Sequence, residues 1–283
     1  MNLDFYSREP LGFEQEIPIF SERNAYTANY EQISGDHLAA LRETGINPFI
    51  EADIWNQAEQ STIALVRKYS RPGEAILDVG VGLARLLSHF PTLRRFGTDI
   101  SLQYLQEARA NGVEVCYALA DDLPYRDEAF DMVVCTDVIE HVLDLNRSCE
   151  RILSTLKPDG ILVVRVPYRE DLTYYASPEC PYRYVHLRTF DEPSLRLFFE
   201  RVMGCEVVET TLAAYAPYGG RLKFPLNFPK RDALLRRVFS LLKAVHPPTY
   251  QAMLRRFFLP IEINVVVRKR AWVPHSEAPC ATS

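Results

Sequence analysis

Short strand-like runs, most of them apolar, alternate with amphipathic stretches along most of the chain from residue 75 onward. The runs that predict buried strands are 75–79, 94–98, 113–119, 130–135 and 160–166, and the stretches that predict helices are 83–90, 101–110 and 145–157. Residues 157–160, Lys-Pro-Asp-Gly, predict a turn between the last of these helices and its strand. Strands and helices that alternate in this way are typical of a doubly wound, mostly parallel sheet, so the pattern predicts an α/β fold.

The same pattern continues to the C-terminal end, with a helix at 191–203 and strands at 205–212 and 261–267, which brings the predicted sheet to seven strands. Thr189 or Asp191 is the expected N-cap of that helix. Residues 71–270 would form this domain, with a helical insertion at 213–259 before the last strand. Helices at 36–45 and 49–70 would form an N-terminal lid within residues 1–70, whereas 1–35 show no strong period. The polar tail at 271–283 is expected to be disordered.

Composition and charge narrow the classes of function. The net charge of −5 argues against a general nucleic-acid binder. Six cysteines without a Cys-x-x-Cys pair indicate a reducing compartment and no structural zinc. The first residues lack a signal-peptide pattern, and no apolar run approaches the ~18 residues of a membrane span. We expect a cytoplasmic location, with a peripheral membrane association left open.

The most informative segment is 75–85, Ala-Ile-Leu-Asp-Val-Gly-Val-Gly-Leu-Ala-Arg. It predicts a buried strand, a glycine turn and a helix start, where backbone amides can bind an anionic group of a ligand. A nicotinamide site would favour a small residue at the third glycine position, which Arg85 occupies here. A P-loop would require Gly-Lys-Ser/Thr, which is absent. A nicotinamide-dependent oxidoreductase is therefore the less favoured alternative.

Five motifs in order resemble those of the class I S-adenosylmethionine-dependent methyltransferases. The first is the Asp-x-Gly-x-Gly of Asp78, Gly80 and Gly82. The others are 97–101 around Asp99, 120–124 around Asp121, the strand 130–135 with its continuation 137–142, and 156–162. The resemblance covers about residues 50–212 and the last strand. Within this class, the resemblance is to small-molecule methyltransferases of type 11/23 and to the methyltransferases of quinone biosynthesis.

The resemblance implies a Rossmann-like fold and S-adenosylmethionine as the methyl donor. Its carboxylate would lie against the amides near Gly80, its ammonium near Asp78, its ribose hydroxyls on Asp99 and its adenine near Asp121. The cofactor-binding residues that it implies are Asp78, Gly80, Gly82, Asp99, Ile100, Asp121, Asp122 and Asp137.

Two histidines are candidate catalytic residues. Methyl transfer needs orientation above all, and it needs a general base only where the acceptor must lose a proton. His141, at the end of the fourth strand, and His186, before the helix at 191–203, would lie near the acceptor, although a structural role for each stays open. The Glu-x-x-Glu-His of quinone-biosynthesis enzymes has an Asp in its first position here, Asp137. Because Asp is one carbon shorter, we predict no metal, while a divalent cation at this motif remains an open alternative.

The acceptor is not determined by any motif. An oxygen of a sugar, a phenol or a lipid-linked intermediate is our first prediction; nitrogen and carbon acceptors, and a non-catalytic cofactor-binding module, remain alternatives. Residues 221–256 carry nine basic residues and one acid. This insertion is either a cap with a solvated basic face or a docking surface for an anionic membrane or a lipid-linked acceptor. No nucleic-acid partner is expected, and the oligomeric state stays open.

Overall fold

The computed structural model describes residues 3–216, 237–239 and 241–270, and its described strands form one sheet of nine. The strands are β1 (Gly12–Glu14), β2 (Ile17–Ile19), β3 (Ala75–Val79), β4 (Arg94–Asp99), β5 (Glu114–Tyr117), β6 (Phe130–Thr136), β7 (Leu156–Pro167), β8 (Glu206–Ala213) and β9 (Glu262–Arg268). Their order across the sheet is β1-β2-β5-β4-β3-β6-β7-β9-β8. β5, β4, β3, β6 and β7 run parallel, and β9 is antiparallel to both of its neighbours. The predicted α/β fold with a mostly parallel sheet is confirmed.

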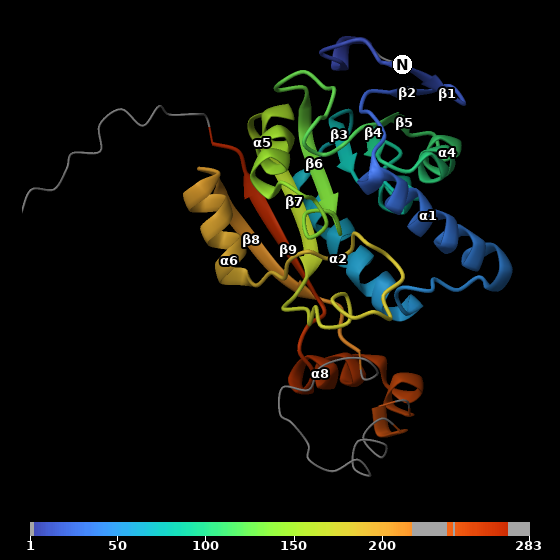
Figure 1. The fold of residues 1–283 in the computed structure, drawn as a ribbon. Coiled ribbons are helices and arrows are strands. Elements are labelled where there is room, and N and C mark those ends of the chain that lie inside the picture. Colours follow the sequence, from blue (N-terminus) through green and yellow to red (C-terminus); the bar gives the residue numbers. More distant parts are fainter. Residues whose placement is uncertain (1–2, 217–236, 240, 271–283) are drawn as a thin grey trace, which may run out of the picture.

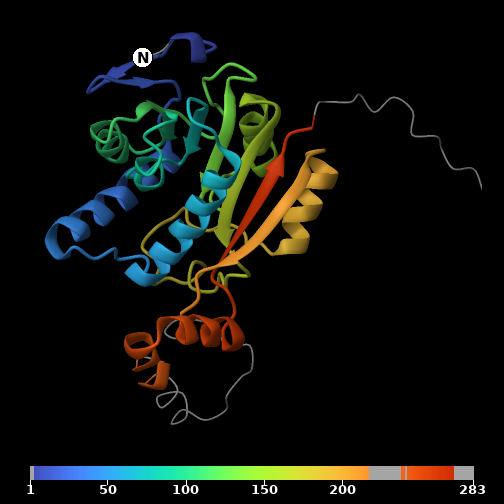
Figure 2. The same ribbon diagram turned by 180° about the vertical axis from the view of Figure 1, so that it is seen from behind.

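Helices cover both faces of this sheet (Figure 1). They are α1 (Ala25–Thr44), α2 (Ala52–Tyr69), α3 (Arg85–Ser88), α4 (Leu102–Ala110), α5 (Leu145–Thr155), α6 (Glu192–Leu197) and α8 (Pro247–Phe257), with short helices η1 (Leu3–Phe5) and η2 (Phe198–Val202). One apolar cluster joins the sheet to α2, α3 and α4, and the other joins it to α5, α6 and the N-terminal segment. Figure 2 shows α2 lying across its face of the sheet. Alternate strand residues feed the two clusters, as expected for a sheet buried on both sides.

The N-terminal segment differs from the predicted lid. Residues 12–19 form the hairpin β1–β2, which pairs with β5 at Ile19 and extends the predicted sheet from seven strands to nine. α1 begins at Ala25, after an N-cap at Asn24, and not at residue 36. Its buried residues include Thr27, Ser34 and His37, so its inner face is largely polar. A helix with such a face lacks the apolar periodicity by which a helix is predicted.

Two other details of the main domain are settled by the structure. The predicted turn at 157–160 lies within β7, beside an irregularity in its pairing with β6, and Asp159 there has a φ of 59°. Asp191, and not Thr189, caps α6, because its side chain accepts a hydrogen bond from the Ser194 amide.

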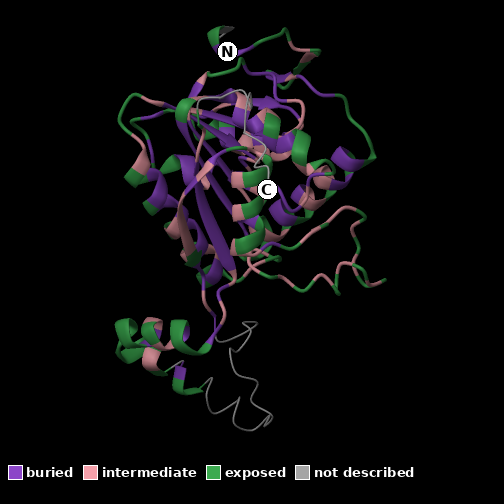
Figure 3. Cartoon of the chain, turned by 90° about the vertical axis from the view of Figure 1, so that its left-hand side faces the viewer, coloured by how far each residue is buried: buried purple, intermediate pink, exposed green. Residues whose placement is uncertain are grey.

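The described part of the insertion stands off the sheet. Residues 237–239, 241–245 and α8 are helical, and a small apolar cluster of Phe239, Tyr250, Leu254 and Phe258 joins them. Figure 3 shows these helices as largely exposed beside the buried sheet. The predicted helix at 231–245 lies partly outside the described residues, and the tail at 271–283 lies wholly outside them. Among the helices that the structure describes, none has the length and apolar character needed to cross a membrane.

Candidate active site

The glycine turn after β3 exposes backbone to a cavity. Gly80 has a φ of 78° and Gly82 a φ of 47°, a left-handed region that favours glycine. A Cβ on Gly80 would lie 2.3 Å from Cγ2 of Val138, whereas a Cβ on Gly82 would meet nothing within 4 Å. The turn therefore packs tightly against the end of β6 at Gly80 and leaves open space at Gly82.

A cavity of about 950 Å³ lies over the carboxyl ends of β3, β4 and β6. In open parallel sheets this edge is where ligands bind. The wall on the strand side includes Asp78, Gly80, Gly82, Asp99, Ile100, Asp121 and Asp137. The opposite wall comes from α1, the start of α2, the connection between them and the segment 174–186. The lid and the sheet together thus enclose one site.

Asp78 is a buried carboxylate with an unused oxygen. It is 2% exposed, and its Oδ1 has no hydrogen-bond partner among the described residues. Burial, and next the nearby Asp99 carboxylate, raise the pKa of Asp78 well above its usual range. A cationic ligand group in the cavity would relieve both effects, which fits the ammonium of an amino acid.

Asp99 is held rigidly at the end of β4. Its Oδ2 accepts a hydrogen bond from the Gly82 amide at 3.0 Å, and its Oδ1 accepts from the amides of Ile100 and Ser101 at 2.8 and 3.0 Å. Burial raises the pKa of Asp99 to about 6, although these amides act in the opposite direction. The two amides use both lone pairs of Oδ1, whereas Oδ2 accepts one bond, so Oδ2 can still accept from a ligand hydroxyl.

Asp121 and Asp122 have different surroundings although they are adjacent. Asp121 lines the cavity, and its nearest ionic partner is the exposed Arg147, at 3.8 Å. Asp122 does not line the cavity: its Oδ2 accepts from the Ser21 hydroxyl at 2.7 Å, and its Oδ1 pairs with Arg8 at 2.8 Å. The sequence-based placement of Asp122 in the cofactor site is therefore corrected. Its carboxylate anchors the N-terminal segment to the sheet.

Asp137 lines the cavity but is engaged in an ion pair. Its carboxylate bonds to the guanidinium of Arg165, which in turn donates to the Thr62 hydroxyl at 3.2 Å. Thr62 donates to the side-chain oxygen of Asn264 at 2.9 Å. This buried polar chain runs from the cavity wall into α2 and β9.

His141 stands where the cavity passes beyond β6. Its Nδ1 is 2.9 Å from the hydroxyl of Tyr30 on α1, and its Nε2 is 3.9 Å from Oε1 of Glu140. Burial, and next the neighbouring His186, lower the pKa of His141 to about 3. The ring is therefore neutral near pH 7 and only weakly basic. Tyr30 and Tyr26 of α1 both line the cavity.

His186 lies against His141, although the two are far apart in the sequence. Their ring centroids are 4.4 Å apart in an edge-to-face arrangement. Nδ1 of His186 bonds to Glu170, whose other oxygen accepts from the Tyr175 hydroxyl at 2.9 Å. Glu170 and Tyr175 were not predicted as site residues. They lie in an irregular stretch of chain, where no periodicity indicates which side chains face inward.

Arg85 ties the lid to the glycine turn. Its guanidinium donates to both carboxylate oxygens of Glu59, at 3.1 and 2.8 Å, and stacks on Trp55 with a centroid distance of 3.6 Å. All three residues line the cavity. The side chain that argues against a dinucleotide site thus fixes α2 over the start of α3.

The chain is similar to known methyltransferases in sequence and in fold. Residues 77–164 match the methyltransferase domain family. A chain from the complex between the Haloferax volcanii Trm112 methyltransferase activator and a putative methyltransferase aligns with a TM-score of 0.59 and 19% identity, covering 89% of this chain and 100% of that one. An S-adenosylmethionine-dependent methyltransferase of Thermotoga maritima, a possible histamine N-methyltransferase, aligns with a TM-score of 0.54 and 18% identity, over 86% of this chain and 99% of that one.

A sequence relative shares only this domain. The tRNA (carboxymethyluridine(34)-5-O)-methyltransferase of Arabidopsis thaliana is 33% identical over 97 residues, which are 33% of this chain and 24% of that protein. The chain spans about half or less of the length of the curated relatives that it matches. The sequence likeness therefore covers only part of each protein, whereas the likeness in fold to the solved structures covers most of this chain.

Proposed function

Because the chain carries a class I S-adenosylmethionine-dependent methyltransferase domain, we propose that it transfers a methyl group from this donor to an oxygen of a small acceptor, such as a sugar, a phenol or a lipid-linked intermediate. The observation that carries the proposal is the single cavity of about 950 Å³. The carboxylates of Asp78 and Asp99, which fit the methyl donor, lie at the end of the cavity nearest the sheet, and the neutral His141 lies beyond β6. Donor and acceptor groups can therefore meet in one cavity.

The residues at the sheet end fit the donor. The free Oδ1 of Asp78 suits an ammonium, the open space at Gly82 lets a ligand approach the backbone, and Asp99 can accept from ribose hydroxyls. When bound, S-adenosylmethionine supplies an electrophilic methyl group and a neutral thioether leaving group. The protein then contributes chiefly proximity and orientation.

The residues beyond β6 fit an acceptor that must lose a proton. His141 is neutral, its Nδ1 is held by Tyr30, and its ring reaches the cavity. An acceptor hydroxyl bonded to Nε2 could pass its proton to that nitrogen as the methyl group is transferred. Nitrogen and carbon acceptors would need this base less, so the histidine favours an oxygen.

We also propose that the insertion brings the acceptor to the site from an anionic surface. Leu241 and Val245 are 66% and 72% exposed, and the exposed Arg237 and Arg256 lie on the same helical insertion. An apolar and basic surface of this kind suits a lipid interface. Co-sedimentation with phosphatidylserine-containing vesicles at low salt, against phosphatidylcholine vesicles, tests the proposal. Equal recovery with both kinds of vesicle would contradict it.

Two measurements test the function as a whole. Calorimetry should show binding of S-adenosylmethionine and no binding of NAD, with Asp99→Asn as the weakened variant. Glycans, phenols, lipid extracts and tRNA are then screened with a methyl-labelled donor; tRNA is included because it is the substrate of a sequence relative. Labelled phenols, sugars or lipids would support the proposal. Donor binding without transfer to any acceptor would favour a non-catalytic module.

A further inference from the structure

Glu140 is a buried carboxylate without hydrogen-bond partners. It is 1% exposed, and neither Oε1 nor Oε2 has a partner among the residues that the structure describes. An isolated carboxylate in such a place costs several kcal/mol unless it is protonated or paired with a cation. The nearest ring nitrogen, Nε2 of His141, lies 3.9 Å from Oε1, beyond hydrogen-bond distance.

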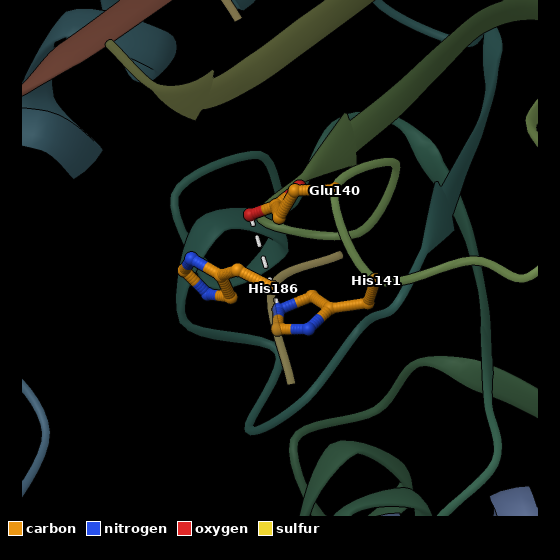
Figure 4. A group of neighbouring side chains, drawn as sticks. All are labelled: Glu140, His141 and His186. Atoms are coloured by element: carbon orange, nitrogen blue, oxygen red, sulfur yellow. Dashed lines mark ion pairs between the residues drawn. The ribbon is translucent and has the colours of Figure 1, made fainter. Parts of the chain in front are cut away.

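Two histidines present ring nitrogens to this carboxylate (Figure 4). One ligand atom from each of Glu140, His141 and His186 lies within 4.8 Å of the others. In both histidines Nδ1 is already held from outside the group, by Tyr30 in one and by Glu170 in the other. Metal-binding histidines are typically oriented in this way, because a carboxylate or other polar group on one nitrogen leaves the second nitrogen for the metal.

The charges around Glu140 are predominantly negative. Asp137, Glu170 and Glu262 act electrostatically on it, and Oε2 of Glu262 is also buried without a partner in the described structure. Among the described cations near this group, Arg165 is paired with Asp137. Arg188 donates to the carbonyl oxygens of Ile139 and Val142 at 2.8 and 2.6 Å. The surroundings thus favour an additional positive charge beside Glu140.

We propose that Glu140, His141 and His186 form a binding site for a divalent transition-metal ion. Two imidazoles and one carboxylate suit Zn²⁺, Co²⁺, Fe²⁺ or Mn²⁺ better than Mg²⁺, which prefers oxygen ligands. Asp137, the first residue of the sequence motif, is not a ligand, because its carboxylate is bound to Arg165. His186, from a distant part of the chain, takes its place. Both histidines line the cavity, so an ion bound between them would lie at its wall.

The metal site would add a group that activates the acceptor. This catalytic role rests on the proposed methyltransferase function. An acceptor hydroxyl that coordinates the cation has a lowered pKa. Its proton leaves to solvent, its oxygen lone pair forms the bond to the methyl carbon, and the electrons of the broken carbon–sulfur bond stay on sulfur. His141 Nε2 cannot be a ligand and a base at once. A bound cation therefore replaces the histidine as the group that promotes proton loss.

Cobalt binding by the full chain tests the site without donor or acceptor. After treatment with a chelator, the protein is titrated with Co²⁺ and followed by its visible absorption and by calorimetry. We expect one Co²⁺ per chain, displaced by Zn²⁺. Glu140→Gln and His186→Gln should each weaken binding at least about tenfold, and Glu170→Gln about 10- to 100-fold, because it removes the group that orients His186. His89→Gln, at an exposed histidine, is the matched control and should bind as the wild type does.

The outcome is decided by the variants. Saturable binding that Glu140→Gln and His186→Gln leave unchanged would overturn the proposal, as would the absence of saturable binding in the wild type. Circular dichroism and S-adenosylmethionine binding by each variant show that it is folded. Because donor binding is measured separately, failure of the metal site is distinguished from failure of the methyltransferase proposal.

Discussion

Substituting Gly80 by Ala should damage the protein more than the same change at Gly82, two residues later. A Cβ on Gly80 would lie 2.3 Å from Cγ2 of Val138, far inside van der Waals contact. The left-handed conformation costs about 1–2 kcal/mol for a residue with a Cβ. Forcing an extra methyl group into a packed site costs about 1–3 kcal/mol more. We therefore expect Gly80→Ala to lower the free energy of unfolding by about 2–5 kcal/mol.

Two matched variants separate the cost of the left-handed conformation from the cost of the contact with Val138. Gly45→Ala, at the end of α1, has a φ of 70° and no atom within 4 Å of the new Cβ, so it reports the conformational cost alone. Gly82→Ala adds its methyl group to open space in the cavity wall and should cost about as much stability as Gly45→Ala. It should weaken binding of S-adenosylmethionine strongly, whereas Gly45→Ala should not.

Urea denaturation and calorimetry with S-adenosylmethionine provide the two readouts. If Gly80→Ala and Gly45→Ala destabilise the protein equally, the contact with Val138 is not as tight as the structure indicates. If Gly82→Ala binds S-adenosylmethionine as the wild type does, the donor does not lie against this turn, and the proposed orientation is wrong.

Four further substitutions test other parts of the site. Asp99→Asn should weaken donor binding at least about tenfold. Because Asp99 has a pKa of about 6, the affinity of the wild type for the donor should fall below pH 6 as Asp99 is protonated. Calorimetry from about pH 5 to about pH 8 should show no such fall in the variant. Arg85→Met should cost about 3 kcal/mol in urea denaturation by leaving Glu59 buried and unpaired, and adding Glu59→Leu should recover most of the loss. His141→Ala should lower kcat about 100-fold or more, and an unchanged kcat would exclude both catalytic roles of this residue. Tyr30→Phe should lower kcat about tenfold through the lost bond to His141 without weakening donor binding; a change confined to donor affinity would make Tyr30 a lid residue only.

The sequence predicted the parts of the fold that local patterns specify. The strands β3 and β6 are short, mostly apolar runs, and each of β3, β4 and β6 is followed by a recognisable turn or helix start, so both their existence and their order could be predicted. The glycine turn was also evident, because the left-handed backbone at Gly80 and Gly82 favours glycine, and Gly80 also has no room for a Cβ.

The first half of α1 could not be predicted, because its buried positions are largely polar. Thr27 belongs to the capping box at its N-terminus, and Ser34 bonds to the Ser101 hydroxyl at the start of α4, so few apolar residues mark the helix. The hairpin β1–β2 was missed as well. Its strands have three residues each, too few to show a period.

What only the tertiary structure decided is the direction of each polar side chain and the neighbours that it meets. Asp121 and Asp122 are equivalent in the sequence, yet one faces the cavity and the other binds Ser21 and Arg8. Glu140 and His141 become a candidate metal site only because an irregular loop brings His186 beside them. Local periodicity determines strands and helices, because it reflects which face of an element is apolar. Contacts between residues distant in the sequence depend on how the loops pack, and no local pattern encodes them.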